Sequence, residues 1–370
     1  MNSINNKYKK RFPRVLVTGG AGFIGSCLIR KLLKNTNSKI FNLDKLSYSS
    51  DLTSINSIIN KFQINEKRYM HSQVDLRKFE DVEKIINYSN PDLIFHLAAE
   101  SHVDRSIDDP NPFIKNNILG TLNLLETANN HYQNLTETRK DSFRLINIST
   151  DEVFGSLSNQ GLFNESSQYN PTSPYSASKA SSDHLVNAWF HTYGLPTITT
   201  NCSNNFGPWQ FPEKLIPLTI IKALSKQNIP IYGDGKNIRD WLFVEDHVDA
   251  LIKISLSGRL GNKYCIGGYK EITNLEIVEN ICEKLDFLRP LNHSYKEFIT
   301  FVKDRPGHDY RYAIDSRKTE KELSWKSNTV FSEALEKTTI WYLNNQYWCK
   351  KVLNKSGYQV ERIGLKANLN

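Results

Sequence analysis

The ten residues Val17–Ser26, read as VTGGAGFIGS, hold three glycines at intervals of three: Gly19, Gly22 and Gly25. They follow the apolar run Arg14–Thr18, which has the composition of a buried strand, and they open a helical pattern. In a strand–turn–helix of this kind, the first glycine permits a tight turn and the second lets backbone N–H groups approach a pyrophosphate. The third glycine lets helix and strand pack closely. The segment therefore predicts a dinucleotide-binding βαβ unit.

A carboxylate at the end of the next strand indicates which dinucleotide binds. Asp44 follows the apolar run Lys39–Leu43 and lies nineteen residues after Gly25. A carboxylate at this spacing accepts hydrogen bonds from both ribose hydroxyls and repels a 2′-phosphate. The sequence therefore favours NAD as the cofactor.

Strand-like and helical segments alternate through the first half of the chain. Apolar runs at Asp92–Ala98 and Phe143–Ser149 are separated by helical patterns, and after about residue 200 the segments become shorter. Alternation of this kind implies right-handed βαβ units and a parallel sheet covered on both faces. We therefore predict an α/β fold, a doubly wound parallel Rossmann sheet with a smaller α/β C-terminal substrate domain.

The domain boundaries follow from these changes of pattern. We predict a disordered arm at residues 1–13, an NAD-binding Rossmann domain at 14–200, and a partly interleaved substrate-binding domain at 201–345. Residues 346–370 are expected to form a C-terminal extension, for which the sequence indicates no chemistry.

Composition excludes several classes of protein. The 370 residues are 39% hydrophobic, and no apolar run is long enough to span a membrane. The five cysteines are scattered without a CxxC pair, so we expect neither a metal site nor disulfides, and we expect a cytoplasmic protein. The net charge of +8 is spread along the chain rather than clustered, which argues against nucleic acid as a partner.

The segment YSASK carries the first candidate catalytic pair, Tyr175 and Lys179. On a helix that begins at Pro174, these two side chains share one face. A lysine ammonium favours the phenolate, and an oxidised nicotinamide adds positive charge, so Tyr175 suits a general base. A Tyr and a Lys at this spacing also occur by chance in helices. Their position about 150 residues after the glycine segment favours the catalytic interpretation.

A second candidate constellation, Thr150, Asp151 and Glu152, follows the strand that ends near Ser149. Adjacent carboxyl groups push one pKa upward, which leaves one group protonated and the other ionised. The ionised carboxylate can remove a carbon-bound proton as a base, and the protonated carboxyl can act as the acid that expels a hydroxyl group as water. Thr150 suits a hydrogen bond to a sugar hydroxyl. The alternative is a turn with a helix cap.

Other positions are expected to face the dinucleotide. Asp75, followed by Leu76, comes after the third strand, where it would reach the adenine amino group or cap a helix. The small residues Ala98 and Ala99 end another strand and leave room for a ligand across the strand ends.

The chain resembles the extended short-chain dehydrogenase/reductases, and within them the nucleotide-sugar 4,6-dehydratases. The resemblance runs from about Arg14 to Tyr342 and rests on TGGAGFIGS, HLAAESHVDRS, STDEVFG, PYSASK, NCSNNFGPWQFPEKLIP and DRPGHDYRYAID. It implies a lyase that binds NAD tightly, takes dTDP-glucose as its substrate and is commonly a homodimer. Sugar 4-epimerases are similar elsewhere but lack the Asp-Glu pair.

The resemblance also implies a role for each catalytic residue. Tyr175, held ionised by Lys179, would take the proton from the sugar O4 while hydride leaves C4 for NAD⁺. Glu152 would then remove the C5 proton while Asp151 protonates the departing C6 hydroxyl. Hydride then returns to C6 and a proton returns to C5, and the product is a 4-keto-6-deoxy sugar. Thr150 would bind near O4.

The implied binding residues fall into two groups. The cofactor group includes the residues already named and eight more: Phe23, Ile24, Lys45, Leu46, Ser47, Ser101, Asn116 and Asn205. The substrate group is Ser101, Asn204, Lys214, Leu215, Pro230, Ile231, Tyr232, Arg239, Asn274, Asp304, Arg305 and His308. Asn116 stands where the family commonly has a threonine, and Arg239 suits a diphosphate because its fork matches phosphate oxygens.

Three functions compete for this sequence. The first is a 4,6-dehydratase of dTDP-glucose or of another nucleotide sugar. The second is a nucleotide-sugar 4-epimerase, which would use Tyr175 and Lys179 without elimination and leaves the pair Asp151 and Glu152 unexplained. The third is a non-catalytic dinucleotide sensor or a basic nucleic-acid-binding protein, against which the complete set of acid–base residues argues.

Overall fold

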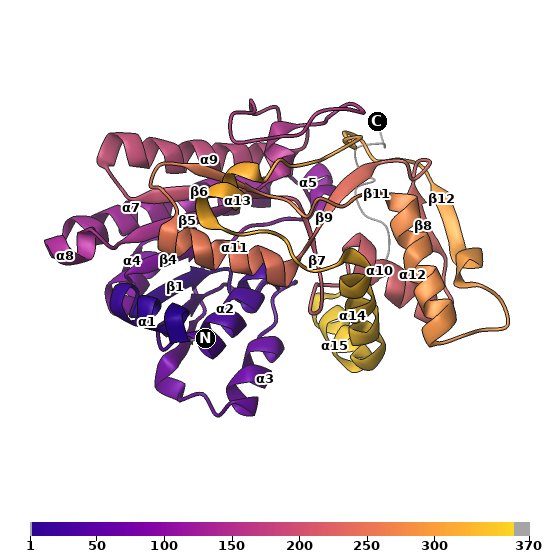
Figure 1. Ribbon diagram of the computed structural model, residues 1–370, viewed down its shortest axis with the longest axis horizontal. Coiled ribbons are helices and arrows are strands. Elements are labelled where there is room, and N and C mark those ends of the chain that lie inside the picture. Colours follow the sequence, from indigo (N-terminus) through magenta and orange to yellow (C-terminus); the bar gives the residue numbers. More distant parts are fainter. Residues whose placement is uncertain (1, 359–370) are drawn as a thin grey trace.

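One parallel sheet organises the N-terminal half of the molecule. The computed structural model describes residues 2–358 (Figure 1). The sheet consists of β1 (Arg14–Thr18), β2 (Lys39–Leu43), β3 (Tyr69–Ser72), β4 (Leu93–His96), β5 (Arg144–Thr150), β6 (Thr197–Cys202) and β10 (Lys263–Ile266). The strands lie in the order β10-β6-β5-β4-β1-β2-β3, and all neighbours pair in parallel. The predicted doubly wound Rossmann sheet is thereby confirmed.

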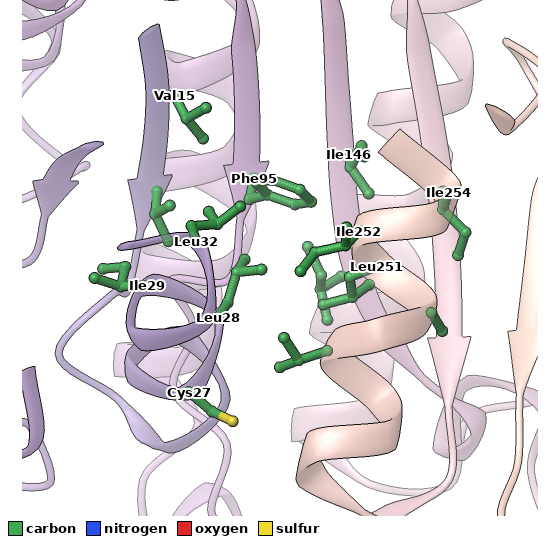
Figure 2. Packing of buried hydrophobic residues seen from close by; sticks show 14 of the residues in the cluster. Val15, Cys27, Leu28, Ile29, Leu32, Phe95, Ile146, Leu251, Ile252 and Ile254 are labelled. Atoms are coloured by element: carbon green, nitrogen blue, oxygen red, sulfur yellow. The ribbon is translucent and has the colours of Figure 1, made fainter. Parts of the chain in front are cut away.

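Helices cover both faces of this sheet. On one face lie α2 (Phe23–Asn35) and α11 (Val244–Ser257); on the other lie α4 (Phe79–Ser89), α7 (Gly120–Gln133) and α9 (Pro174–Tyr193). Figure 2 shows apolar side chains of α2, of α11 and of the strands β1, β4 and β5 lying between the helices and the sheet: Val15, Leu28, Ile29, Leu32, Phe95, Ile146, Leu251, Ile252 and Ile254. Burial of this apolar surface fixes the helices on the sheet and so fixes the loops at its carboxyl edge.

The N-terminal residues are the first correction to the sequence analysis. The predicted disordered arm, residues 1–13, contains the helix α1 (Asn2–Arg11). Tyr8 and Phe12 are fully buried, and the Tyr8 hydroxyl hydrogen-bonds to Ser255 on α11. The segment is too polar for its sequence to indicate an amphipathic helix. It folds because two aromatic side chains pack against residues that lie far along the chain.

A smaller α/β domain occupies the right side of Figure 1. Its strands are β7 (Asn204–Phe206), β8 (Ile229–Tyr232), β9 (Ile238–Phe243), β11 (Glu271–Thr273) and β12 (Ile299–Val302), in the two sheets β11-β9-β7 and β12-β8. Its helices are α10 (Leu215–Leu224), α12 (Asn274–Leu288) and α14 (Phe331–Asn344). The two domains are interleaved, since α11, β10 and α13 (Arg317–Leu323) return to the Rossmann sheet.

The expected C-terminal extension is partly built into the smaller domain. Helix α15 (Gln346–Ser356) buries Trp348, Cys349 and Val352 in the apolar core of that domain. The rest of the extension, from residue 359 onward, lies outside the described residues.

The remaining elements are short or lie at the periphery. They are α3 (Thr53–Lys61), η1 (Glu66–Arg68), α5 (Val103–Asp108), α6 (Asn111–Phe113), the π-helical η2 (Ile114–Leu119), α8 (Glu137–Lys140), η3 (Asp151–Phe154) and η4 (Tyr295–Phe298). Within residues 2–358, no helix has the length and apolar character that a membrane crossing requires, and no three His, Cys, Asp or Glu side chains gather as metal ligands.

Candidate active site

A cavity of about 460 Å³ lies at the carboxyl edge of the central sheet. Gly19, Asp44, Ala98, Thr150 and Cys202 line it from five strand ends. Its other wall comes from the smaller domain. Parallel α/β sheets bind ligands at this edge, where loops from several strands converge.

The cavity brings together nearly all the residues predicted for the site. On the cofactor side these are Gly19, Gly22, Phe23, Ile24, Gly25, Asp44, Lys45, Ser47, Asp75, Leu76, Ala98, Ala99, Asn116 and Asn205. On the catalytic and substrate side they are Ser101, Thr150, Glu152, Tyr175, Lys179, Asn204, Lys214, Leu215, Pro230, Ile231, Tyr232, Arg239, Asn274, Arg305 and His308. Three predicted residues do not line it: Leu46, Asp151 and Asp304.

The glycine segment forms a cradle that fits a dinucleotide. Gly19 has a φ of 68°, and a Cβ there would lie 2.5 Å from the backbone nitrogen of Ala98, across the switch point between β1 and β4. The N-cap of α2 is Gly22, which has no side chain to satisfy the first N–H groups of the helix. The first turn, from Phe23 to Gly25, lines the cavity, and such a helix start attracts phosphate.

Asp44 is held in position by three hydrogen bonds. Its Oδ2 accepts from the Ala21 N–H at 2.9 Å, and its Oδ1 accepts from the Leu46 N–H at 2.8 Å and the Ser50 hydroxyl at 3.0 Å. The carboxylate is therefore oriented before a ribose arrives. Leu46, with a φ of 57°, contributes its backbone rather than its side chain.

Two further polar residues of the cofactor side have partners of their own. Lys45 Nζ donates to Glu100 at 2.7 Å and to Asn116 at 3.0 Å, so Asn116 is joined to the loop that follows β2. Asp75 accepts from the backbone N–H of Arg77 at 3.0 Å and from its guanidinium at 2.6 Å. Asp75 thus lines the cavity and caps a turn rather than helix α4, whose N-cap is Lys78; its contact with adenine stays a prediction.

Gly25→Ala tests the cradle. A Cβ at Gly25 would lie 2.3 Å from the Gly19 carbonyl oxygen, so the turn must shift. We expect a loss of about 1–3 kcal/mol in the free energy of unfolding, as for other overpacked sites, and weaker NAD binding. Chemical denaturation and calorimetric titration with NAD measure the two effects. The control is Ser26→Ala, since this neighbour already carries a Cβ; equal losses in both variants would contradict the steric argument.

Helix α9 presents Tyr175 and Lys179 one turn apart. The helix begins at Pro174 because Ser173 forms a capping box with Ser176, in which the Ser173 hydroxyl accepts from the Ser176 N–H at 3.1 Å. Tyr175 and Lys179 both line the cavity, and Lys179 Nζ donates to the Ile148 carbonyl oxygen at 2.9 Å.

The electrostatics of Tyr175 differ from the sequence expectation. Burial of the phenol raises the pKa of Tyr175 well above its ordinary value, and the Glu152 carboxylate raises it further. Burial also lowers the pKa of Lys179. The protein's own groups therefore favour the neutral phenol, because a buried phenolate would lose its hydration and would lie near the Glu152 carboxylate.

The carboxyl pair follows β5 directly. Thr150 is the N-cap of the short helix η3, and its Oγ1 accepts from the Glu152 N–H at 3.3 Å. The same oxygen donates to Asp151 Oδ1 at 3.2 Å. Glu152 faces the cavity, whereas Asp151 is only 1% exposed and lies behind Thr150. The turn-and-cap alternative is thus realised locally, yet it places Glu152 at the cavity wall and Asp151 in contact with the wall residue Thr150.

The two carboxyl groups have different electrical surroundings. Burial, followed by the charges of Glu152 and Asp240, raises the pKa of Asp151 well above its ordinary value. Burial also raises the pKa of Glu152, but three cations oppose that rise: Arg305, Lys214 and Arg239. Asp151 is therefore the better proton donor and Glu152 the better base.

The smaller domain supplies the cations. Arg239 is anchored by the carbonyl oxygens of Ile238 at 2.8 Å and Asp309 at 3.0 Å. Arg305 donates to Asp104 at 2.6 Å, and Asp104 also accepts from the Tyr232 hydroxyl at 2.9 Å. Guanidinium groups held in this way at a cavity wall suit phosphate oxygens.

His308 and Asp304, both predicted for the substrate side, are hydrogen-bonded to each other. His308 lines the cavity, and its Nδ1 hydrogen-bonds at 2.6 Å to Asp304, which stays outside.

Sequence reasoning missed a buried cluster around Glu213. This carboxylate accepts from the Tyr48 hydroxyl at 2.8 Å and from Arg105 Nε at 3.3 Å. The Arg105 guanidinium lies 4.0 Å from the centre of the Tyr48 ring, and His102 also lines the cavity. The only available signal was the position of Glu213 next to Lys214, because the cluster unites residues that are more than 100 positions apart.

These features together define a class of protein: a short-chain-type, NAD-dependent enzyme whose second domain holds an anionic substrate against a tyrosine and a carboxyl pair. Residues 16–338 match the model of the family described as GDP-mannose 4,6 dehydratase, and the chain belongs to that family.

Several known proteins are similar along almost their whole length. A dTDP-glucose 4,6-dehydratase of Neisseria meningitidis serogroup B is 49% identical, over 95% of this chain and 99% of its own. One from Salmonella typhimurium is 50% identical, over 93% and 96%. The crystal structure of the Bacillus anthracis enzyme in complex with NAD superposes with a TM-score of 0.79 at 39% identity, and covers 91% of this chain and 99% of that one.

Proposed function

We propose that this protein is a hydro-lyase that converts dTDP-glucose to dTDP-4-keto-6-deoxyglucose and water. The observation that carries the proposal is the pair Asp151 and Glu152 directly after β5, in electrically different surroundings. Glu152 lines the same cavity as Tyr175, and Asp151 is hydrogen-bonded to Thr150 of the cavity wall. An epimerase needs no such pair. The similar proteins of 49–50% identity are dTDP-glucose 4,6-dehydratases.

The cofactor is NAD, held by the glycine cradle and by Asp44. Bound there, NAD would supply reversible hydride transfer at the sugar C4 and C6 and would not be consumed. Tyr175 removes the proton from O4. Burial and the Glu152 carboxylate raise the pKa of this phenol, and the positive charge of an oxidised nicotinamide would favour its ionised form.

Elimination uses the two carboxyl groups. Oxidation at C4 acidifies the C5 proton, which Glu152 removes in its ionised form. Asp151 protonates the departing C6 hydroxyl, which leaves as water. When hydride returns to C6, the proton returns from Glu152 to C5. Since Asp151 lies behind Thr150, the acid either turns toward C6 or transfers its proton through the Thr150 hydroxyl, to which it is hydrogen-bonded.

The nucleotide half of the substrate lies against the smaller domain. Lys214, Arg239 and Arg305 neutralise the diphosphate, and Lys214 also donates to the Ser101 carbonyl oxygen at 2.7 Å, which brings the sugar side close. The base and deoxyribose bind along a wall formed by Asn204, Leu215, Pro230, Ile231, Tyr232, Asn274 and His308.

The finer proposals concern assembly and location. A homodimer is supported by the family resemblance and by the apolar residues Ile114 and Leu119 of η2, which are 47% and 42% exposed. A cytoplasmic location is supported by five free, buried cysteines.

Incubation with dTDP-glucose tests the proposed function. We expect a product that is lighter by one water and absorbs in strong base, without net formation of reduced cofactor. Mass spectrometry and absorbance measure these outcomes. An isomer of unchanged mass would indicate a 4-epimerase. Faster elimination from another nucleoside diphosphate glucose would correct the assigned base.

A further inference from the structure

The loop Lys45–Asp51 sets the position of the ribose-binding carboxylate. The Ser50 hydroxyl donates to Asp44 Oδ1 at 3.0 Å, and the Asp51 N–H donates at 2.9 Å to the carbonyl oxygen of Ala21. Ala21 in turn donates its own N–H to Asp44 Oδ2 at 2.9 Å. Any movement of this loop away from the glycine turn therefore moves Asp44.

The outer side of the same loop is held by α15. Trp348 Nε1 donates to Asp51 Oδ1 at 3.0 Å, and Lys355 Nζ donates to the Ser50 carbonyl oxygen at 3.2 Å. These two contacts come from side chains seven residues apart, about two turns, on one helix. They reach the two residues, Ser50 and Asp51, whose other groups fix Asp44 and the glycine turn.

Helix α15 is itself anchored to the smaller domain. The Trp348 ring centre lies 5.3 Å from that of Trp209 and 5.2 Å from that of Trp341, within the apolar core of that domain. In Figure 1, α14 and α15 lie together in the lower middle of the view, between the two domains. The helix therefore ties the loop after β2 to a rigid part of the other domain.

The chain continues from α15 to the cavity. Tyr358 lines the cavity, with its ring centre 6.4 Å from that of Phe211 and 5.8 Å from the Arg105 guanidinium. Helix α15 and Tyr358 thus form a clasp, residues 346–358, that runs from the cofactor loop to the substrate wall.

We propose that this clasp retains the dinucleotide during the catalytic cycle by holding the loop Lys45–Asp51, and with it Asp44, closed over the cofactor. The proposal rests on the proposed function, because a cofactor that is first reduced and then reoxidised must not leave between the two steps. Trp348 and Lys355 act as positioning residues through Asp51 and Ser50 and do not touch the substrate.

Exchange of bound NAD tests the clasp without using substrate. Purified protein loaded with radiolabelled NAD is chased with unlabelled NAD, and the dissociation rate is compared among variants. Lys355→Met removes one charge-assisted hydrogen bond and is expected to raise that rate about 3- to 10-fold. Trp348→Phe keeps an aromatic ring in the core and removes the donor to Asp51, and a similar increase is expected.

Control variants distinguish an effect on NAD retention from an effect on the stability of the protein. Lys351→Met alters an exposed lysine of the same helix and is expected to leave the dissociation rate unchanged. Lys355→Arg keeps a donor and is expected to restore most of the retention. Turnover of Lys355→Met with dTDP-glucose should rise on addition of free NAD, whereas that of the unaltered protein should not.

Dissociation rates of Lys355→Met and Trp348→Phe equal to that of the unaltered protein would overturn the clasp, whatever the change in melting temperature. Faster NAD release without any dehydratase activity would keep the clasp as a cofactor-retention element and overturn the proposed reaction instead.

Discussion

Glu152→Gln is expected to reduce turnover of dTDP-glucose by about 10²–10⁴-fold, the usual contribution of a general base. The amide keeps the shape of the side chain but does not accept the C5 proton. Oxidation at C4 does not need this carboxylate, so the bound cofactor is expected to remain in its reduced form after mixing with substrate. Stopped-flow absorbance of the reduced nicotinamide, together with the rate of product formation, measures both effects.

The matched control for this variant is Glu137→Gln, which removes a carboxylate that is 88% exposed on its side chain and lies on α8, away from the cavity. Normal turnover by Glu152→Gln would show that another group removes the C5 proton. Loss of turnover without any reduced cofactor would place Glu152 at the first step instead.

Tyr175→Phe is expected to lower the rate of cofactor reduction by about 10²–10⁴-fold, because no base remains for the O4 proton. The ring itself should stay in place, since it packs edge-on against Phe113 with centres 6.3 Å apart. Single-turnover measurement of the reduced nicotinamide separates this defect from that of Glu152→Gln: the first variant prevents reduction and the second prevents reoxidation.

Tyr132→Phe is the control for the lost hydroxyl. Tyr132 lies on α7, packs on Phe143 and does not line the cavity, so cofactor reduction should be unchanged. Cofactor reduction at the normal rate in Tyr175→Phe would remove this phenol from the mechanism.

Local patterns predicted most of the central sheet. The bounds of β1 and β2 agree with the predicted runs, and α2 follows the glycines as the helical pattern indicated. β4 is shorter than Asp92–Ala98, because its last predicted residues leave the sheet to line the cavity. By contrast, α1 was missed because its stability comes from Tyr8 and Phe12 in a distant apolar pocket rather than from its own periodicity.

In the candidate site too, residues close in sequence could be predicted, whereas groups that meet only in the folded chain could not. Cradle and catalytic residues were found from spacing, since Gly19 to Asp44 and Tyr175 to Lys179 belong to single supersecondary units. The cluster around Glu213 and the clasp were not found, because their members are separated along the chain. Trp348 and Asp51, for example, are 297 positions apart and meet only through the packing of two domains.

By itself, then, the sequence determined the Rossmann sheet, and it predicted the residues of the dinucleotide cradle and the acid–base residues, because each depends on neighbours within one or two turns or strands. Only the tertiary structure decided how those residues behave as acids and bases. Burial raises the pKa of Tyr175 against the expectation from Lys179. Burial and the Glu152 charge raise the pKa of Asp151, whereas cations of the smaller domain oppose the rise at Glu152. Desolvation and charge act through space, and they depend on which distant segments close over a group.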